Sequence, residues 1–204
     1  MKKHFLLLTL MISSYHSFSQ AKDDIILGGG VNIVLDKDAT GRTNNSFYIN
    51  PGAGYFFNEH WGAGLFMSYN TRTSQDTGAL DLKYVNTETG FGPWLRYTQT
   101  LSNIFFIFGQ LDLAYNSGIA SVGSIKVPMT RTTGMSANLY PVVGINVHKG
   151  FALNIGIGGV GYVSSKSASD VNSSGRFTFN FGKTLQIGVS KFFNTSKKAE
   201  PPTQ

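Results

Sequence analysis

The chain has no cysteine and little charge. Without a single Cys among its 204 residues, it can form neither disulfide bonds nor thiolate metal sites. Charged residues make up 14% of the chain, against roughly 25% in an average soluble domain. The formal net charge is +6, but Lys and Arg are scattered and form no basic stretch of the kind that binds nucleic acid. We therefore expect no nucleic-acid partner.

A long apolar run is also missing. The apolar segment 5–12 is far shorter than the roughly 20 residues of a membrane-spanning helix. It follows Lys2 and Lys3 and precedes the small residues Ser17 and Ser19, which is the order of a secretory signal peptide. We predict removal of residues 1–19, with cleavage after Ala21 as the alternative, over a buried N-terminal helix. A mature chain of this kind can enter a membrane only with strands.

What the chain does have is an alternation of apolar and small or polar residues. From Ile25 to Phe193 the odd positions are apolar, and the even positions between them are mostly Gly, Asn, Ser and Gln. A period of two predicts strands. Eight strands are predicted, over residues 24–36, 46–57, 61–71, 84–101, 104–116, 137–148, 151–162 and 176–193.

The connections between these strands alternate in length. Three contain only three residues between apolar positions of the same face, at 58–60, 102–104 and 148–150. Four are long and polar, predicted over residues 37–45, 72–83, 117–136 and 163–175. Short turns at one end and long loops at the other are typical of an outer-membrane barrel.

The composition of the two strand faces indicates which one points outward. A soluble lipocalin-like barrel would carry a charged outer surface, whereas the polar face here is rich in Gly and Asn, which suit a narrow lumen. Aromatic residues bracket the apolar face, Trp61 with Tyr69 and Phe105 with Tyr115, at the spacing of a tilted strand that crosses the hydrocarbon. The prediction is an all-β fold, an eight-stranded antiparallel up-and-down transmembrane β-barrel over residues 20–193. Residues 194–204 are predicted to form a flexible tail.

On these features the chain resembles the small eight-stranded outer-membrane barrels of Gram-negative bacteria, of the OmpA/OmpX type. The last strand, 186–193, is similar to the C-terminal assembly signal of that class: Gln186, Gly188 and alternating apolar residues up to Phe193. It departs from the signal at Lys191, where an aromatic residue is usual, and in the residues that follow Phe193. The resemblance implies a porin-like protein of the outer membrane that is recognised by the assembly machinery. We also expect contact with outer-membrane lipids, including lipopolysaccharide, and a monomeric state.

Two charged residues are predicted to point into the lumen. By parity Arg96 and Asp112 face inward, and the turn at 102–104 places position 96 opposite Gln110, so that Asp112 is a diagonal neighbour. One interpretation is a polar network that fills the lumen, because inward charges must be paired. The other is a gate in a small pore.

Basic residues flank the two largest predicted loops. Lys126, Arg131, Lys166 and Arg176 form a positive excess on one half of the predicted barrel mouth. Ammonium and guanidinium groups bind phosphate by charge-assisted hydrogen bonds. The four residues are therefore candidates to hold lipid phosphates, with solvated loop charges as the alternative.

Three functions from different classes remain open. The bulky inward residues and eight-strand size favour a filled lumen with a structural or surface-interaction role; a narrow porin-like channel for ions or small solutes is the alternative. An envelope-lipid enzyme ranks a distant third: His60 and His148 both fall in short turns, and no nucleophile, base and orienting group come together. We predict no enzymatic activity, no metal site and no cofactor.

Backbone irregularities are predicted at Pro51, Pro93 and Pro141, since proline cannot donate to a strand ladder. Lys183 interrupts the apolar series of the last strand; either it lies at the outer membrane interface, or a bulge there reverses the strand phase.

Overall fold

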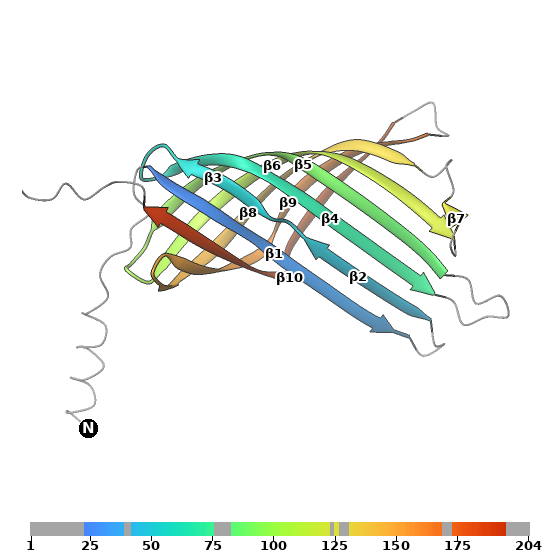
Figure 1. Ribbon diagram of the computed structural model, residues 1–204, viewed down its shortest axis with the longest axis horizontal. Coiled ribbons are helices and arrows are strands. Elements are labelled where there is room, and N and C mark those ends of the chain that lie inside the picture. The colour runs from blue at the N-terminus through green and yellow to red at the C-terminus, as the bar shows by residue number, and fades with distance from the viewer. Residues whose placement is uncertain are drawn as a thin grey trace, which may run out of the picture.

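The structure, a computed structural model, describes residues 23–38, 42–75, 83–122, 125–126, 131–168 and 173–194. These residues form one antiparallel sheet wound into a barrel (Figure 1). No helix in the described ranges is long and apolar enough to cross a membrane. The strands are β1 (Asp24–Lys37), β2 (Thr43–Ile49), β3 (Gly52–Phe56), β4 (Trp61–Gln75), β5 (Lys83–Thr100), β6 (Phe105–Val122), β7 (Ile125–Lys126), β8 (Thr132–His148), β9 (Phe151–Ser167) and β10 (Ser174–Asn194).

These elements make the eight-stranded closed barrel that the alternation predicts. β2 and β3 together form the second strand, because both pair with β1 on one side and β4 on the other. The two-residue β7 only extends the edge of β6. Neighbours in the sheet are neighbours in the chain, and β10 closes the barrel against β1 through seven pairs, from Asp24↔Asn194 to Gly30↔Gly188. The predicted fold class, all-β and up-and-down, is confirmed.

The three short turns lie as predicted, at the end of the barrel that holds Asp24 and Asn194. The predicted long loops were too long. β6 continues to Val122 and β8 begins at Thr132, although residues 117–136 were predicted to be a loop. Polar Ser, Thr, Asn and Gly residues continue the ladder there, because backbone pairing needs no apolar side chain. The predicted signal peptide and most of the tail lie outside the described residues.

All three prolines lie at breaks in the pairing, and at Pro93 the β5–β6 ladder has no pair between Phe91↔Tyr115 and Trp94↔Asp112. Pro51 separates β2 from β3, and the neighbouring Asn50 fills the break by accepting a 2.7 Å hydrogen bond from the Gly30 amide through its side chain. Pro141 lies beside a register shift between β8 and β9. Across from Pro141, β9 carries the extra residue at Gly158–Gly159, where Gly158 has a φ of +97°.

This bulge in β9 reverses the strand phase, which the sequence analysis had sought only near Lys183. Before it, the odd residue Ile157 is exposed; after it, the even residue Tyr162 is exposed and pairs with the exposed Phe177. β10 also shifts register between Phe181 and Gln186, but its odd residues face outward on both sides of the shift. The Gly-rich sequence of β9 permits the left-handed backbone that absorbs the extra residue.

The two faces of the sheet differ as a membrane barrel requires. Except in β9 beyond its bulge, odd residues point outward and even residues inward; Leu65, Met67 and Phe91 each keep more than 60% of their surface exposed. Inside the lumen, Phe56 and Phe106 are fully buried. The apolar core of the protein therefore lies inside the barrel, and a second apolar surface faces outward toward lipid.

Candidate functional site

Bulky side chains fill the lumen near the end with the short turns. Two clusters meet there, one around Phe56 and Trp94 and the other around Phe106 and Phe108. Phe192 joins the clusters, with its ring centroid 6.1 Å from those of both Phe56 and Phe106. We call this set of side chains, with the polar groups that cover it, the lumen plug.

Glycines on the facing strands make room for these rings. A Cβ atom on Gly54 would lie 2.1 Å from the Trp94 ring, and one on Gly144 would lie 2.0 Å from Cζ of Phe106. The inward glycines thus have a packing role, which explains why the polar face is so rich in this residue. Each large ring occupies the space that a side chain at the position of the glycine would need.

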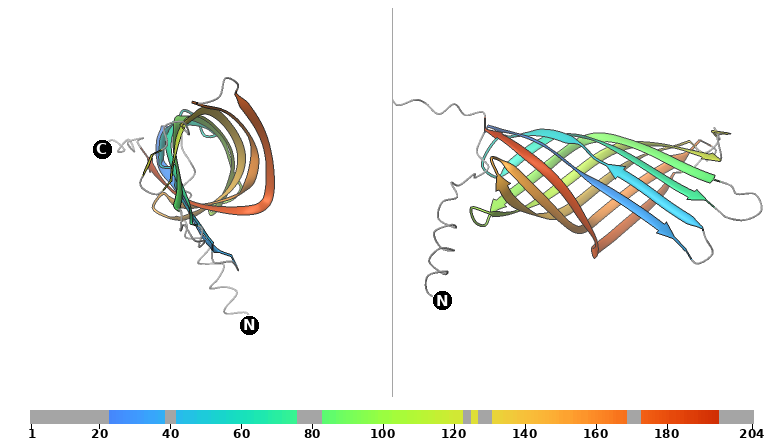
Figure 2. Two further views of the ribbon diagram at one scale, coloured as in Figure 1. Left: turned by 90° about the vertical axis from the view of Figure 1, so that its right-hand side faces the viewer. Right: turned by 60° about the horizontal axis from the view of Figure 1, so that its bottom comes forward.

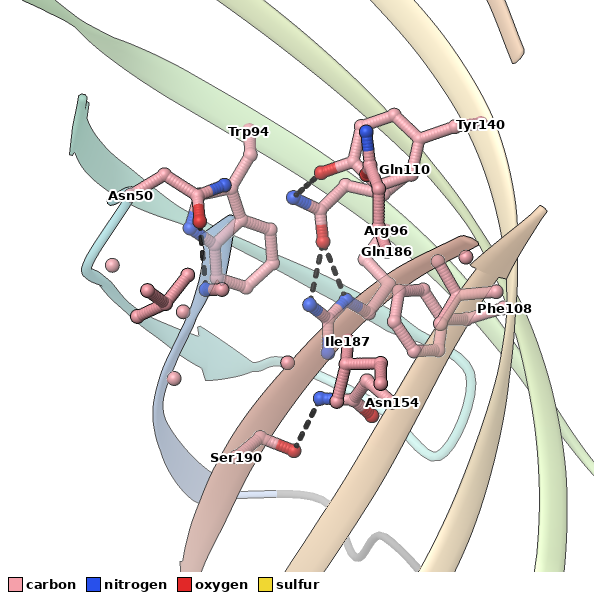
Figure 3. A pocket seen from close by; sticks show the side chains of 18 of the residues that line it. Asn50, Trp94, Arg96, Phe108, Gln110, Tyr140, Asn154, Gln186, Ile187 and Ser190 are labelled. Carbon is pink, nitrogen blue, oxygen red and sulfur yellow. Dashed lines mark hydrogen bonds between the residues drawn. The ribbon is translucent and has the colours of Figure 1, made fainter. Parts of the chain in front are cut away.

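A hydrogen-bonded network covers the apolar part of the plug (Figure 3). Arg96 donates from Nε and Nη2 to Oε1 of Gln110, at 2.8 and 2.5 Å. Gln110 donates in turn from Nε2 to Oδ1 of Asp112 at 2.7 Å and to the Tyr140 hydroxyl at 2.8 Å. The Tyr140 hydroxyl donates to Oδ2 of Asp112 at 2.7 Å. Both carboxylate oxygens therefore accept a hydrogen bond, and the amide of Gln110 links the two charged residues.

The guanidinium of Arg96 also lies against two aromatic rings. Its Cζ is 3.9 Å from the centroid of Phe108 and 5.1 Å from that of Trp94. Stacking on ring faces stabilises a cation that is removed from water. Nη1 of Arg96 is nevertheless buried without a hydrogen-bond partner, as is Oδ1 of Asn154.

The structure places the predicted inward pair in one network but not in direct contact. Arg96 is opposite Gln110, as the turn at 102–104 implied, and Asp112 is reached only through Gln110. The sequence analysis missed Gln110 and Tyr140 as partners. Parity placed both side chains in the lumen, but the pairing of Gln110 with Tyr140 depends on the β6–β8 register, which no short turn determines.

The four basic residues near the barrel mouth do not share one face. Lys166 lies on β9 after the phase reversal, on the outward face with Tyr162. Arg131, just before the start of β8, accepts a backbone hydrogen bond from Ala168 and is the diagonal neighbour of Lys166. Arg176 is opposite Val163, on the lumen side of the sheet. Lys126 pairs with Ser121 through the backbone, and its side chain is outside the described part.

The three residues of the predicted assembly signal lie along the closing strand. Phe193 is opposite Ile25 and Gly188 opposite Gly30, both in the β1–β10 ladder, whereas Gln186 pairs only with Gly156 of β9. Lys191 interrupts the outward apolar series, and its ammonium lies 4.4 Å from the ring centroid of Phe151. Recognition of these residues by the assembly machinery stays a prediction.

The turn histidines take no part in the plug. His60 lies against the ring of Tyr97, with centroids 5.6 Å apart, and His148 ends β8. Within the ranges that the structure describes, no group of three or more His, Cys, Asp and Glu residues is placed to hold a metal ion.

The outward apolar face, the lumen plug and the antiparallel barrel define a transmembrane β-barrel of the Gram-negative outer-membrane type. The chain belongs to the family described as outer membrane protein beta-barrel domain, which matches residues 5–194. The protein is thus located in the outer membrane. No curated protein matches the chain.

Solved structures share the fold at low sequence identity. OprG of Pseudomonas aeruginosa is 16% identical with a TM-score of 0.52, over 87% of this chain and 99% of OprG. Ail, the attachment invasion locus protein of Yersinia pestis, solved with the heparin analogue sucrose octasulfate, is 13% identical with a TM-score of 0.48, over 84% and 99%. Neisserial surface protein A is 14% identical with a TM-score of 0.44, over 83% and 97%.

Proposed function

We propose that this protein is a non-conducting barrel of the outer membrane that acts at the cell surface through its outer strand ends and loops. The observation that carries the proposal is the lumen plug. Phe56, Phe106 and Trp94 are buried across the lumen, and the Arg96–Gln110–Asp112–Tyr140 network covers them. An eight-stranded barrel is only wide enough for such side chains, so a continuous water path through it would need the plug to move.

A planar-bilayer recording of the refolded full chain tests the proposal. We expect no steady single-channel current in 1 M KCl, because the plug blocks the lumen. A variant with Phe56, Phe106 and Phe108 replaced by Ala serves as the positive control, since it removes three rings from the plug and should pass current. Steady current through the parent protein at a level close to that of this control would favour the narrow-channel alternative.

The surface role that we favour is contact with lipopolysaccharide phosphates through Arg131 and Lys166. Both side chains are exposed and lie diagonally on the outward face at the outer strand ends, where they can reach the phosphate-bearing outer leaflet. Arg176 is exposed on the opposite face of the sheet and is directed away from that leaflet. Of the predicted basic residues, Arg131 and Lys166 are therefore the ones placed to contact lipid phosphates.

Neutral variants of these residues test whether the outward pair, and not Arg176, contacts lipopolysaccharide. We expect added lipopolysaccharide to raise the Tm of the parent and of Arg176→Gln equally, and to raise that of the double variant Arg131→Gln/Lys166→Gln less. The expected loss is small, about 0–1 kcal/mol per exposed contact, so thermal unfolding with and without lipopolysaccharide is compared within one preparation. An equal rise in all three proteins would contradict the phosphate role and leave the residues as solvated loop charges.

A further inference from the structure

The wall of the barrel is paired only part of the way along its closing seam. β1 and β10 pair from Asp24↔Asn194 to Gly30↔Gly188, and no ladder pair in the described residues joins them beyond that point. The outer half of β1 pairs only with β2, and the outer half of β10 only with β9. Figures 1 and 2 show the two strands side by side at the end with the termini and diverging toward the other end. We call the unpaired part the open seam.

The backbone of β10 is irregular next to the point of divergence. Four residues of β10, 182–185, stand opposite the single residue Ile157 between the pairs Phe181↔Gly158 and Gln186↔Gly156. Gly182 begins this bulge with a φ of +74°, a conformation that glycine adopts without strain. The bulge lies just beyond the last closing pair, where the two strands begin to diverge.

Side-chain exposure shows that the lumen is accessible beside the open seam. Val34 points to the lumen face by parity, yet 46% of its surface is exposed. Arg176, Thr178 and Asn180, on the lumen face of β10, are exposed as well. Unpaired backbone at membrane depth is tolerated where it lines a water-filled cavity. The open seam therefore leaves the upper lumen accessible from the side of the barrel.

A cavity of about 120 Å³ lies where the open seam meets the plug. Val31 and Ile187 line it from the seam, and Trp94, Phe108 and Arg96 line it from the plug. A dry cavity of about 150 Å³ holds a benzene ring, so this one has room for a polar head group and the first few carbons of a chain. The remainder of a longer chain would extend through the seam, along the exposed apolar residues Val31 and Ile33 of β1.

Arg96 supplies the chemical preference of the cavity. Its side chain is more than nine-tenths buried, and Nη1 has no hydrogen-bond partner. In Figure 3 this third guanidinium nitrogen points away from Gln110, on the side of Asn154. A buried donor without a partner is costly, and a guanidinium makes strong charge-assisted hydrogen bonds to the oxygens of a carboxylate.

We propose that the cavity is a binding site for a single-chain carboxylate amphiphile, such as a fatty acid, which enters sideways from the membrane through the open seam. The carboxylate accepts a hydrogen bond from Nη1 of Arg96. The first carbons lie among Trp94, Phe108 and Ile187, and the tail remains in the seam and the lipid. The site ends at the plug, so binding requires no passage across the barrel. The proposal is therefore independent of the surface role and of the conductance result.

Fluorescence of Trp94 can measure this binding directly. The chain has two tryptophans, so Trp61→Phe leaves Trp94 as the only one, and this variant serves as the parent. The full chain is refolded into phosphatidylcholine vesicles and titrated with 2-bromododecanoic acid, whose bromine quenches a nearby indole. We expect quenching that saturates. Arg96→Gln should weaken it roughly ten- to hundredfold, which corresponds to one lost hydrogen bond to a charged group.

Three comparisons make the assignment specific. The alcohol of the same chain should bind the parent and Arg96→Gln alike, because it lacks the charge. Gly156→Leu should abolish saturable quenching by both probes, since its Cβ would meet only Gln186 and Val142, at 3.4 Å or more, and the rest of the side chain would fill the cavity. Gly109→Leu is the matched control: a Cβ there meets nothing within 4 Å, and position 109 faces outward.

Each alternative has its own signature. Equal quenching of the parent and of Gly156→Leu would mean that the amphiphile only dissolves in the surrounding lipid. Equal binding of the acid to the parent and to Arg96→Gln would mean that water, and not a carboxylate, satisfies the guanidinium. Saturable quenching by 2-bromopropionate as strong as that by the long acid would indicate a site for small soluble carboxylates. Any of these results would overturn the proposal, and the Gly156→Leu comparison remains decisive if Arg96→Gln does not fold.

Discussion

Replacement of Asp112 by Ala is expected to lower the free energy of unfolding by about 3–5 kcal/mol, the usual cost of removing one partner of a buried charge pair. Asp112 is buried and accepts hydrogen bonds from Gln110 and Tyr140. Without its carboxylate both donors lose an acceptor, and the charge of Arg96 remains in the lumen uncompensated. Urea unfolding of the refolded barrel measures the loss.

A double-mutant cycle tests whether Arg96 and Asp112 are energetically coupled. Arg96→Met/Asp112→Ala should be destabilised by less than the sum of the single variants, because the second replacement removes the stranded charge. Asp112→Asn is the matched control, since it keeps an acceptor for Tyr140 and should cost less than Asp112→Ala. Additive losses would mean that Arg96 and Asp112 are energetically independent and that each is satisfied by its own neighbours.

Replacement of Gly144 by Val is expected to destabilise the barrel by about 1–3 kcal/mol or more, the range for an overpacked core. The first added carbon would lie 2.0 Å from Cζ of Phe106, and Phe106 is itself fully buried against Phe108 and Phe192. The added side chain therefore competes for space with a ring that is already packed against two others. Loss of the folded, heat-modifiable band in gels and a lower urea midpoint would both report the change.

A double-mutant cycle can also be made for Gly144 and Phe106. In a Phe106→Ala background, the Gly144→Val replacement should become stabilising, because the new side chain fills the space that the ring has left. Gly109→Val, which adds the same bulk where nothing lies within 4 Å, should leave the stability close to that of the parent. A Gly144→Val loss that persists unchanged without the Phe106 ring would show that the cost comes from the backbone instead of the packing.

The alternation of the sequence was sufficient to predict the class of fold and the direction of each face. Leu65 and Met67 are odd and exposed, while Phe56 and Phe106 are even and buried, because a strand sends successive side chains to opposite faces. The register of Arg96 against Gln110 could also be predicted. A three-residue turn connects β5 to β6 and determines their pairing locally.

Features that depend on distant strands could not be read from the sequence. Tyr140 reaches Asp112 only through the β6–β8 register, and the bulge at Gly158–Gly159 reverses β9 in a stretch where small residues leave no clear alternation. The outer strand ends were predicted to be loops for the same reason: their polar residues carry no period, although their backbones pair.

The sequence by itself determined a membrane barrel with small and bulky residues in its lumen, since that result follows from a local period of two and from the turn lengths. Only the tertiary structure decided how the barrel closes. The β1–β10 seam joins the two ends of the strand series, Asp24 to Asn194, and no turn connects them. The extent of that pairing depends on the twist and bulges accumulated in all the strands between. The pairing ends at Gly30↔Gly188, close to the bulge at 182–185, and the unpaired part of the seam adjoins the cavity that Arg96 lines.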